Sequence, residues 1–188
     1  FLQNINVGVA ITAGKLGIGF TDANVKVGNT ALDSLTTGNY NTAVGHQSLT
    51  ANTTGSNNTS VGNESLDANT TGASNTAIGA AALGVNSTGD NNVAVGALAL
   101  DANTTASANT AVGRASLSAN TTGANNTAVG YNSLVSNTTA SNNTAVGTDA
   151  LSVNTTGTKN TAVGQGSLDA NTTGDHNVAI GNDALGAN

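Results

Sequence analysis

The chain has 188 residues, of which 7% are charged and 2% aromatic, and its formal net charge is −6 at pH 7. An acidic chain without a cationic stripe is not expected to bind nucleic acid or an anionic membrane surface, and the absence of cysteine excludes a disulfide framework and a thiolate metal site. The scarcity of aromatic residues also excludes a conventional core, because large side chains normally supply most of the buried area.

Residues 1–23 contain a degenerate first copy of a motif that recurs along the chain. The segment Asn4 to Gly8 matches Asn24 to Gly28, but the interval between these two copies is longer than the interval between the later ones. The region lacks the basic start of a signal peptide. We therefore expect residues 1–23 to form a degenerate first coil or a joining segment.

From residue 24 to residue 188 the sequence is a tandem repeat with a period of seventeen, the interval from Gly28 to Gly45. Each repeat has Asn four positions before a Gly, Val or Ile directly before it, and Leu four positions after it. The glycines are Gly28, Gly45, Gly62, Gly79, Gly96, Gly113, Gly130, Gly147, Gly164 and Gly181. A repeat this short is incompatible with helix-turn-helix arrays, whose periods are roughly 33 residues or more.

The composition of the repeat predicts strands. Gly, Asn and Thr recur every few residues and are poor in helix interiors, whereas Thr-Ala-Val followed by Gly is typical of a short strand of four or five residues. No Asn-Gly pair occurs to form a hairpin turn. The sequence thus predicts an all-β fold, a parallel β-solenoid (β-roll or β-helix) of about eleven coils, with a length of about 50 Å.

One coil cannot bury enough apolar surface to fold alone, so identical residues should stack on one another from coil to coil. We expect the first Asn of each repeat to form a side-chain amide ladder along the axis, although the same Asn is also a good turn residue. The predicted ladder residues are Asn41, Asn58, Asn75, Leu49, Leu66, Leu83, Val44, Val61, Gly45 and Gly62.

Ala43 and Val44 are neighbours in a predicted strand and therefore point to opposite sides of it. Whichever of them lines the interior, a row of apolar groups remains outside. A soluble monomer should not expose such a stripe along its whole length. The pattern favours lateral association, as a trimer, over a single-chain solenoid.

The segments Asn92 to Gly96 and Asn177 to Gly181 resemble the repeat of trimeric autotransporter adhesin heads. The longer segment Asn126 to Leu134, with Asn137 to Thr139, resembles repeats in tail-fibre-like surface proteins of phages and bacteria. The resemblance covers residues 24–188 and implies a parallel β-roll that associates as a trimer on a cell or virion surface. The period is longer than that of adhesin heads, so each coil should carry a longer loop.

Eight repeats carry an Asn followed one and two positions later by Thr or Ser, which is an N-glycosylation sequon. These residues are candidate glycosylation sites, and the alternative is a polar turn that was copied with the repeat. Neighbouring Thr rows are candidates for O-glycosylation instead. The Asn residues are Asn52, Asn69, Asn86, Asn103, Asn120, Asn137, Asn154 and Asn171.

Other patterns favour no specific chemistry. Thr53 and Thr54 suggest an ice-binding hydroxyl array, but adjacent residues of a strand face opposite ways. Asp67 and Asp101 share a row two coils apart, about 9.6 Å, which is too far to share a calcium ion. His46 and His176 occupy different slots of the repeat. We therefore predict no catalytic residue, no metal and no cofactor.

Taken together, these observations predict a non-enzymatic, glycosylated structural subunit of an extracellular fibre or filament. It would self-associate end to end, laterally, or both, at the cell or virion surface, without nucleic acid and without membrane insertion. The alternatives are an adhesin or phage tail-fibre shaft that binds a receptor and, less favoured, an ice-binding solenoid.

Overall fold

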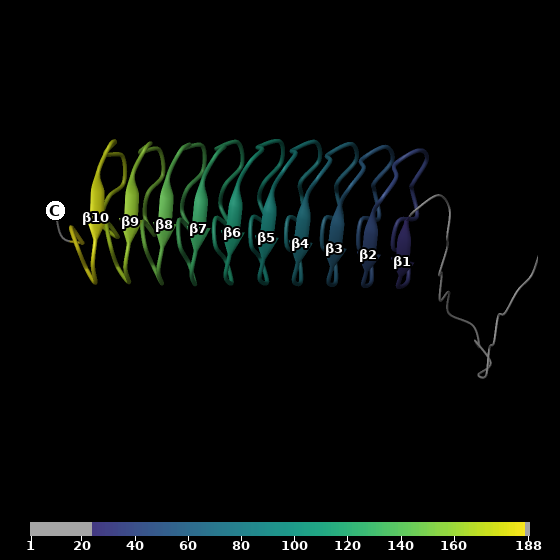
Figure 1. The fold of residues 1–188 in the computed structure, drawn as a ribbon, viewed down its shortest axis with the longest axis horizontal. Coiled ribbons are helices and arrows are strands. Elements are labelled where there is room, and N and C mark those ends of the chain that lie inside the picture. Colours follow the sequence, from purple (N-terminus) through teal and green to yellow (C-terminus); the bar gives the residue numbers. More distant parts are fainter. Residues whose placement is uncertain (1–23, 187–188) are drawn as a thin grey trace, which may run out of the picture.

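The computed structural model describes residues 24–186, which form a rod of stacked coils (Figure 1). Ten strands make one parallel sheet in chain order, and none of the described residues is helical. The strands are β1 (Val25–Val27), β2 (Thr42–Val44), β3 (Thr59–Val61), β4 (Thr76–Ile78), β5 (Val93–Val95), β6 (Thr110–Val112), β7 (Thr127–Val129), β8 (Thr144–Val146), β9 (Thr161–Val163) and β10 (Val178–Ile180).

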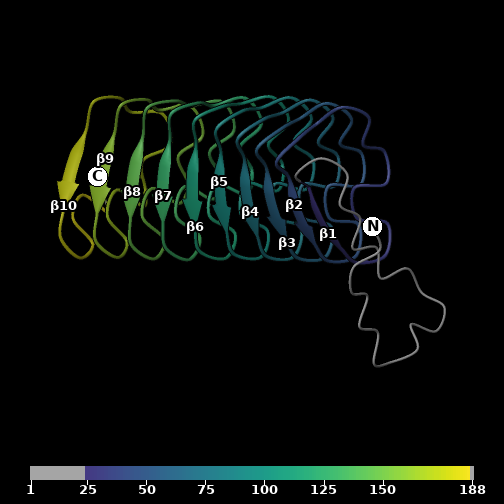
Figure 2. The same cartoon turned by 45° about the vertical axis from the view of Figure 1, so that its right-hand side comes forward.

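Every strand pairs with the next in strict register. Thr42 pairs with Thr59 and Val44 with Val61, and the same offset of one repeat holds from β1 to β10. The chain makes one complete coil between successive strands, as the turned view shows (Figure 2). These observations confirm the predicted parallel β-solenoid, in which equivalent residues of successive coils stack on one another. The predicted first coil at residues 1–23 lies outside the described residues.

The strands contain three residues, fewer than the four or five that the sequence predicts. The glycine after each strand ends it: Gly45 has φ +139°, which L side chains rarely adopt. A Cβ atom at Gly45 would also collide with the backbone carbonyl of Gly62, one coil further along. The glycine row is therefore required both for the turn and for the close approach of successive coils.

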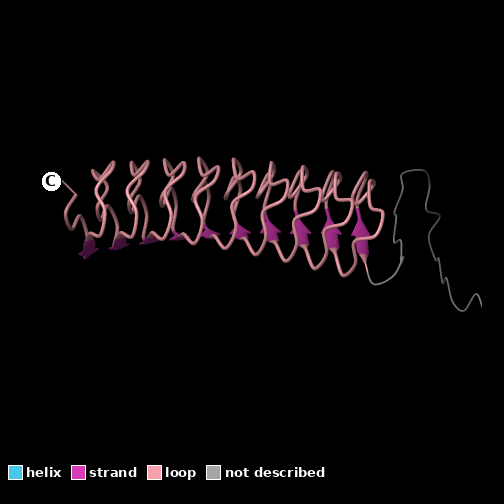
Figure 3. Cartoon of the chain, turned by 90° about the horizontal axis from the view of Figure 1, so that it is seen from above, coloured by secondary structure: helices cyan, strands magenta, loops and turns pink. Residues whose placement is uncertain are grey.

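Each turn after the glycine places non-glycine residues in the left-handed region. Gln47 has φ 56° and Leu49 has φ 53°, and the corresponding Leu of every coil has φ between 48° and 54°. For a bulky residue this conformation costs about 1–2 kcal/mol, which the burial of a leucine side chain, about 1.5–3 kcal/mol, offsets. From above, the strands lie along one side of the rod and the turns along the other (Figure 3).

The interior is narrow and in most coils holds one alanine and one leucine side chain. In the second coil these are Ala43 and Leu49, both completely buried, and they share the interior with the fully buried Asn41 and Asn52. The middle residue of the strand therefore points inward. The side chain of Val44 points outward, and only its backbone takes part in the pairing with the next strand.

Candidate functional site: an interaction surface

The first Asn of each repeat ties the coils together through the backbone. The side-chain carbonyl Oδ1 of Asn41 accepts a hydrogen bond from the backbone N–H of Asn58 at 3.0 Å. Its Nδ2 donates across the interior to the carbonyl oxygen of Gly55 at 2.9 Å. Asn58 and Asn75 repeat this pattern. We call this set, from Asn24 to Asn177, the bridging row, because it joins the two walls of each coil.

The second buried Asn of each repeat forms the continuous side-chain amide ladder. The Nδ2 of Asn69 donates to Oδ1 of Asn52 at 2.9 Å, and its other hydrogen goes to the carbonyl oxygen of Gly72 at 3.0 Å. The pattern continues through Asn86, Asn103, Asn120, Asn137 and Asn154 to Asn171, with amide-to-amide distances of 2.8–3.1 Å. We call this set the ladder row.

This geometry corrects the glycosylation expected for the ladder row, Asn52, Asn69, Asn86, Asn103, Asn120, Asn137, Asn154 and Asn171. All but Asn171 are completely buried. An N-linked glycan replaces one hydrogen of Nδ2, and from Asn69 onward both hydrogens are used inside the rod. A glycan on this row is therefore incompatible with the folded coil. The side-chain amide ladder expected at Asn41, Asn58 and Asn75 is continuous in the ladder row instead; in the bridging row Asn41 and Asn58 accept from the backbone, and Asn75 also accepts from the side-chain amide of Asn92 at 3.2 Å.

The two threonines that follow the ladder row have different environments. The hydroxyl of Thr53 donates to the carbonyl oxygen of Thr70 at 3.0 Å, and the equivalent bond recurs in successive coils at 2.8–3.3 Å. Thr54 is exposed. The two rows thus do not form the single flat hydroxyl array that the ice-binding alternative requires.

A flat array of alternate residues exists instead on the outer side of the strands. The first and third residues of every strand point outward, and we call these two rows the sheet face. The first row is Val25, Thr42, Thr59, Thr76, Val93, Thr110, Thr127, Thr144, Thr161 and Val178; the second row is Val27, Val44, Val61, Ile78, Val95, Val112, Val129, Val146, Val163 and Ile180.

The sheet face is uniformly β-branched and uncharged. Within it, Val61 and Val163 are 36% exposed and Ile78 is 40% exposed. Because β-branched side chains have few rotamers, the surface is stiff as well as apolar. The half-exposed side chains form one continuous strip along the rod, whereas the exposed apolar residues of a soluble chain are normally scattered singly. This face is the strongest candidate for an interaction surface on the described part of the rod.

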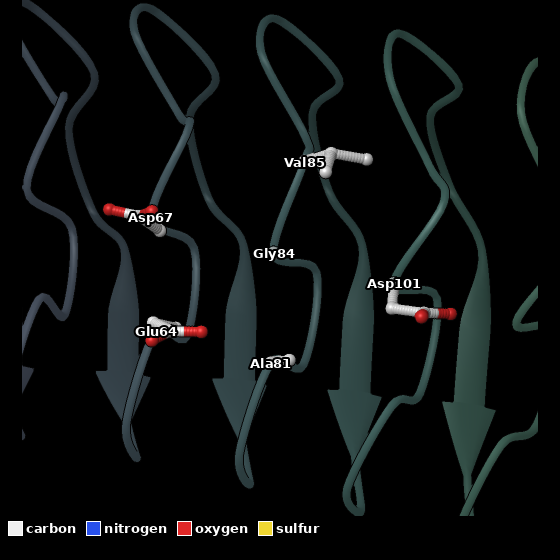
Figure 4. A pocket seen from close by; sticks show the side chains of 6 residues that line it. All are labelled: Glu64, Asp67, Ala81, Gly84, Val85 and Asp101. Atoms are coloured by element: carbon white, nitrogen blue, oxygen red, sulfur yellow. The ribbon is translucent and has the colours of Figure 1, made fainter.

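The acidic residues form a shallow depression rather than a metal site. Gly84 lacks a side chain between Asp67 and Asp101, and the depression is lined by these residues with Glu64, Ala81 and Val85 (Figure 4). The two aspartate carboxylates point away from each other in this view. Partial burial raises the pKa of Asp101, and partial burial with the charge of Glu64 raises the pKa of Asp67. Among residues 24–186, no three His, Asp or Glu side chains are grouped to hold a metal ion.

The serines and histidines that could serve as a nucleophile or a base have other environments. Ser48 and Ser65 are buried and bonded to the hydroxyl of Ser60, at 2.8 Å and 2.5 Å. His46 lies on the surface next to Asn63, with 3.2 Å between its Nδ1 and the Asn63 Oδ1. His176 lies in a different slot of a distant coil.

No family model matches this chain, and no curated protein or solved structure is detectably similar to it. The described residues also contain no helix long and apolar enough to cross a membrane.

Proposed function

We propose that this chain is a passive, rigid segment of an extracellular fibre whose chains associate side by side through the sheet face. The observation that carries the proposal is the composition of that face. Over ten consecutive strands, all twenty outward positions are Thr, Val or Ile, without one charged residue. A second copy of the same face is an occupant with matching chemistry.

Stiffness along the axis is supported by the columns of hydrogen bonds. Each coil is joined to the next by backbone bonds, by the bridging row, by the ladder row and by the Thr53 row. Most of these groups are buried, so each is costly to break without a replacement partner. A rod of this kind transmits load and keeps its shape, which is what a fibre shaft requires.

The area of the sheet face favours more than two chains. A three-residue strand spans about 10 Å and strands lie about 4.8 Å apart, so ten strands offer about 500 Å². That is less than the roughly 800 Å² per partner of a standard stable interface. In a closed trimer three such faces, about 1,500 Å² in total, are buried around one axis, which is close to the roughly 1,600 Å² total of a standard interface. The resemblance of the repeat to trimeric adhesin heads supports the same number and a location at a cell or virion surface.

End-to-end association stays a prediction. The joining segment expected at residues 1–23 lies outside the described residues. Side-by-side association does not depend on them and can be tested separately.

The test is the mass of the full 188-residue chain in solution, measured by sedimentation equilibrium over a range of concentrations. We expect a trimer of the 18.1 kDa chain. The double variant Val95→Lys and Val129→Lys should be monomeric, because it places charges in the middle of the face. The matched control is Asn142→Lys, since Lys159 already occupies that exposed slot in the following coil. A monomeric parent chain at all concentrations would overturn the proposal.

Ice binding is the second candidate, and the sheet face favours it more than the Thr53 and Thr54 rows do. Seven of the ten first-row positions are Thr, and each stands two residues from a Val or Ile on the same side. This gives hydroxyl and methyl groups at regular intervals on a stiff surface. Thermal hysteresis of the monomeric chain that Val129→Lys abolishes would support this candidate, and its absence would remove it.

A further inference from the structure

The Asn-Thr-Thr triplet, which is Leu-Thr-Thr at residues 35–37 and Asn-Ser-Thr at residues 86–88, distributes its three residues among three environments. Asn52 is completely buried in the ladder row. The hydroxyl of Thr53 is used in a bond to the next coil. Thr54 is exposed, and neither its hydroxyl nor that of its equivalents has a hydrogen-bond partner within the described residues. Of the triplet, only the last residue offers a reactive oxygen to the solvent.

We call the equivalents of Thr54 the outer threonine row. Every one of them is classed as exposed. The row consists of Thr37, Thr54, Thr71, Thr88, Thr105, Thr122, Thr139, Thr156 and Thr173.

The row is uniform where neighbouring exposed positions are not. Three residues further along, the exposed slot is Tyr40, Asn57, Ser74 and then other residues in later coils. In the Thr53 row, whose hydroxyl is used structurally, Ser87 replaces Thr once and keeps the bond at 3.0 Å. The outer row is threonine in all nine coils although no intramolecular bond requires its hydroxyl. Its uniformity therefore points to a use outside the chain.

We propose that the outer threonine row is a row of O-glycosylation acceptors. The threonine Oγ forms a glycosidic bond with the anomeric carbon of a nucleotide-activated sugar. The bond from that carbon to the phosphate oxygen breaks, the nucleoside diphosphate leaves with the electron pair, and a base of the transferase takes the hydroxyl proton. The reaction consumes one activated sugar per threonine and involves no oxidation.

The spacing of the row favours a neutral sugar over phosphate as the attached group. Successive acceptors lie about 4.8 Å apart. Phosphates at this distance would each carry about −1.5 to −2 charges and repel strongly. Sugars would supply hydration to a rod with only 7% charged residues and would lie outside the strands, so that the sheet face stays free. The inference does not depend on lateral association.

The first experiment is mass spectrometry of the intact protein isolated from the cells that produce it, followed by fragmentation that retains side-chain modifications. We expect a mass above 18.1 kDa by a whole number of sugar residues, mapped to the outer threonine row. The bare mass, or sugars mapped instead to Asn52, Thr53 or their equivalents, would overturn the proposal.

The second experiment measures transfer of labelled sugar from a nucleotide sugar to the unmodified recombinant chain by an extract of the same cells. The triple variant Thr71→Val, Thr88→Val and Thr105→Val should lose about a third of the label, since three of nine acceptors are removed. The control Thr70→Ser retains its structural hydroxyl and should be labelled like the parent. Equal labelling of parent and triple variant, with unchanged circular dichroism, would contradict the assignment. Lateral association is measured on the unlabelled chain, so either proposal can fail alone.

Discussion

The side-chain amide of Asn103 donates to the side-chain carbonyl of Asn86, one coil earlier, at 2.8 Å. Asn120 donates to Asn103 in the same way at 3.1 Å, and all three residues are completely buried. The Oδ1 of Asn103 thus accepts from one neighbouring Asn, and its Nδ2 donates to the other and to the backbone carbonyl oxygen of Ala106 at 3.1 Å. Removing one member leaves partners on both sides without replacement, because water does not reach them.

Replacing Asn103 with Ala should therefore lower the free energy of unfolding by about 3 kcal/mol, since a buried acceptor on Asn86 and a buried donor on Asn120 both lose their partner. Urea unfolding of the full chain measures this. The matched control is Asn125→Ala, an exposed position whose equivalent in the preceding coil is already Ala108. Equal destabilisation by the two changes would contradict the structural role of the ladder row.

The leucine column supplies most of the apolar burial. Leu117 is completely buried, so Leu117→Ala should cost about 2–5 kcal/mol through lost burial and the cavity left behind. Leu98 is 37% exposed and stands where the adjacent coils have Ala81 and Ala115. The change Leu98→Ala should therefore alter stability by no more than about 0.5 kcal/mol. Thermal unfolding followed by circular dichroism distinguishes the two variants.

The glycine that ends each strand should not tolerate a side chain. Gly113 has φ +130°, and a Cβ atom at this position would collide with the backbone carbonyl of Gly130. The variant Gly113→Ala should therefore be strongly destabilised or fail to fold. At Gly84 the nearest contact of a Cβ atom is 3.3 Å from the Ala81 carbonyl oxygen, and φ is unexceptional. The neighbouring Ala81 carbonyl has to move by only a few tenths of an ångström, and Asp67 and Asp101 already carry side chains in this slot, so Gly84→Ala should fold with at most a small change in midpoint. A folded, stable Gly113→Ala chain would show that the coils do not approach as closely as described.

Two aspartates should give the rod a measurable dependence on pH. Partial burial raises the pKa of Asp101 in the folded chain, so protonation favours folding. The stability gained from the protonated Asp101 is complete below the unfolded pKa of about 3.9. This stability is lost as the pH rises through the higher pKa of the folded chain. Asp101→Asn should therefore raise the melting midpoint at pH 7, with a gain that shrinks toward pH 3.

Asp175 provides the contrast, because hydrogen bonds from the backbone and side chain of Thr158 lower its pKa. Its contribution is present above the unfolded value and is lost as the pH falls through the folded one. Asp175→Asn should thus lower the midpoint at pH 7 and have no effect in strong acid. Midpoints that shift in the same direction for both variants would contradict the assigned environments.

Much of the fold follows directly from the repeat. The constant interval between equivalent glycines leaves one stacking arrangement in which Val44 meets Val61 and Leu49 meets Leu66, and the coordinates have this register. The strands are one or two residues shorter than the sequence predicts. Gly45 ends its strand because it adopts φ +139°, and the residue type alone does not specify that angle. The left-handed conformation of Leu49 had no signal in the sequence, since leucine disfavours it.

The candidate surfaces could be predicted only in part. The presence of an outward apolar row follows from strand alternation, but the pattern Thr-Ala-Val is compatible with either orientation. Likewise, the sequence of the Asn-Thr-Thr triplet matches a glycosylation sequon. In the structure, its first residue lies in the interior and its last on the surface. The sequence around a residue does not show whether a neighbouring coil buries it.

The amino-acid sequence by itself determined that equal residues stack in parallel coils, because only neighbouring copies can satisfy so many small and polar groups. The tertiary structure alone decided what lies inside. Once Leu49, Asn41 and Asn52 fill a coil, the middle position of the strand has room for a small side chain, Ala43 here and Ser60 in the next coil, both completely buried. That limit on volume turns Thr42 and Val44 outward and so creates the face on which the proposed function rests.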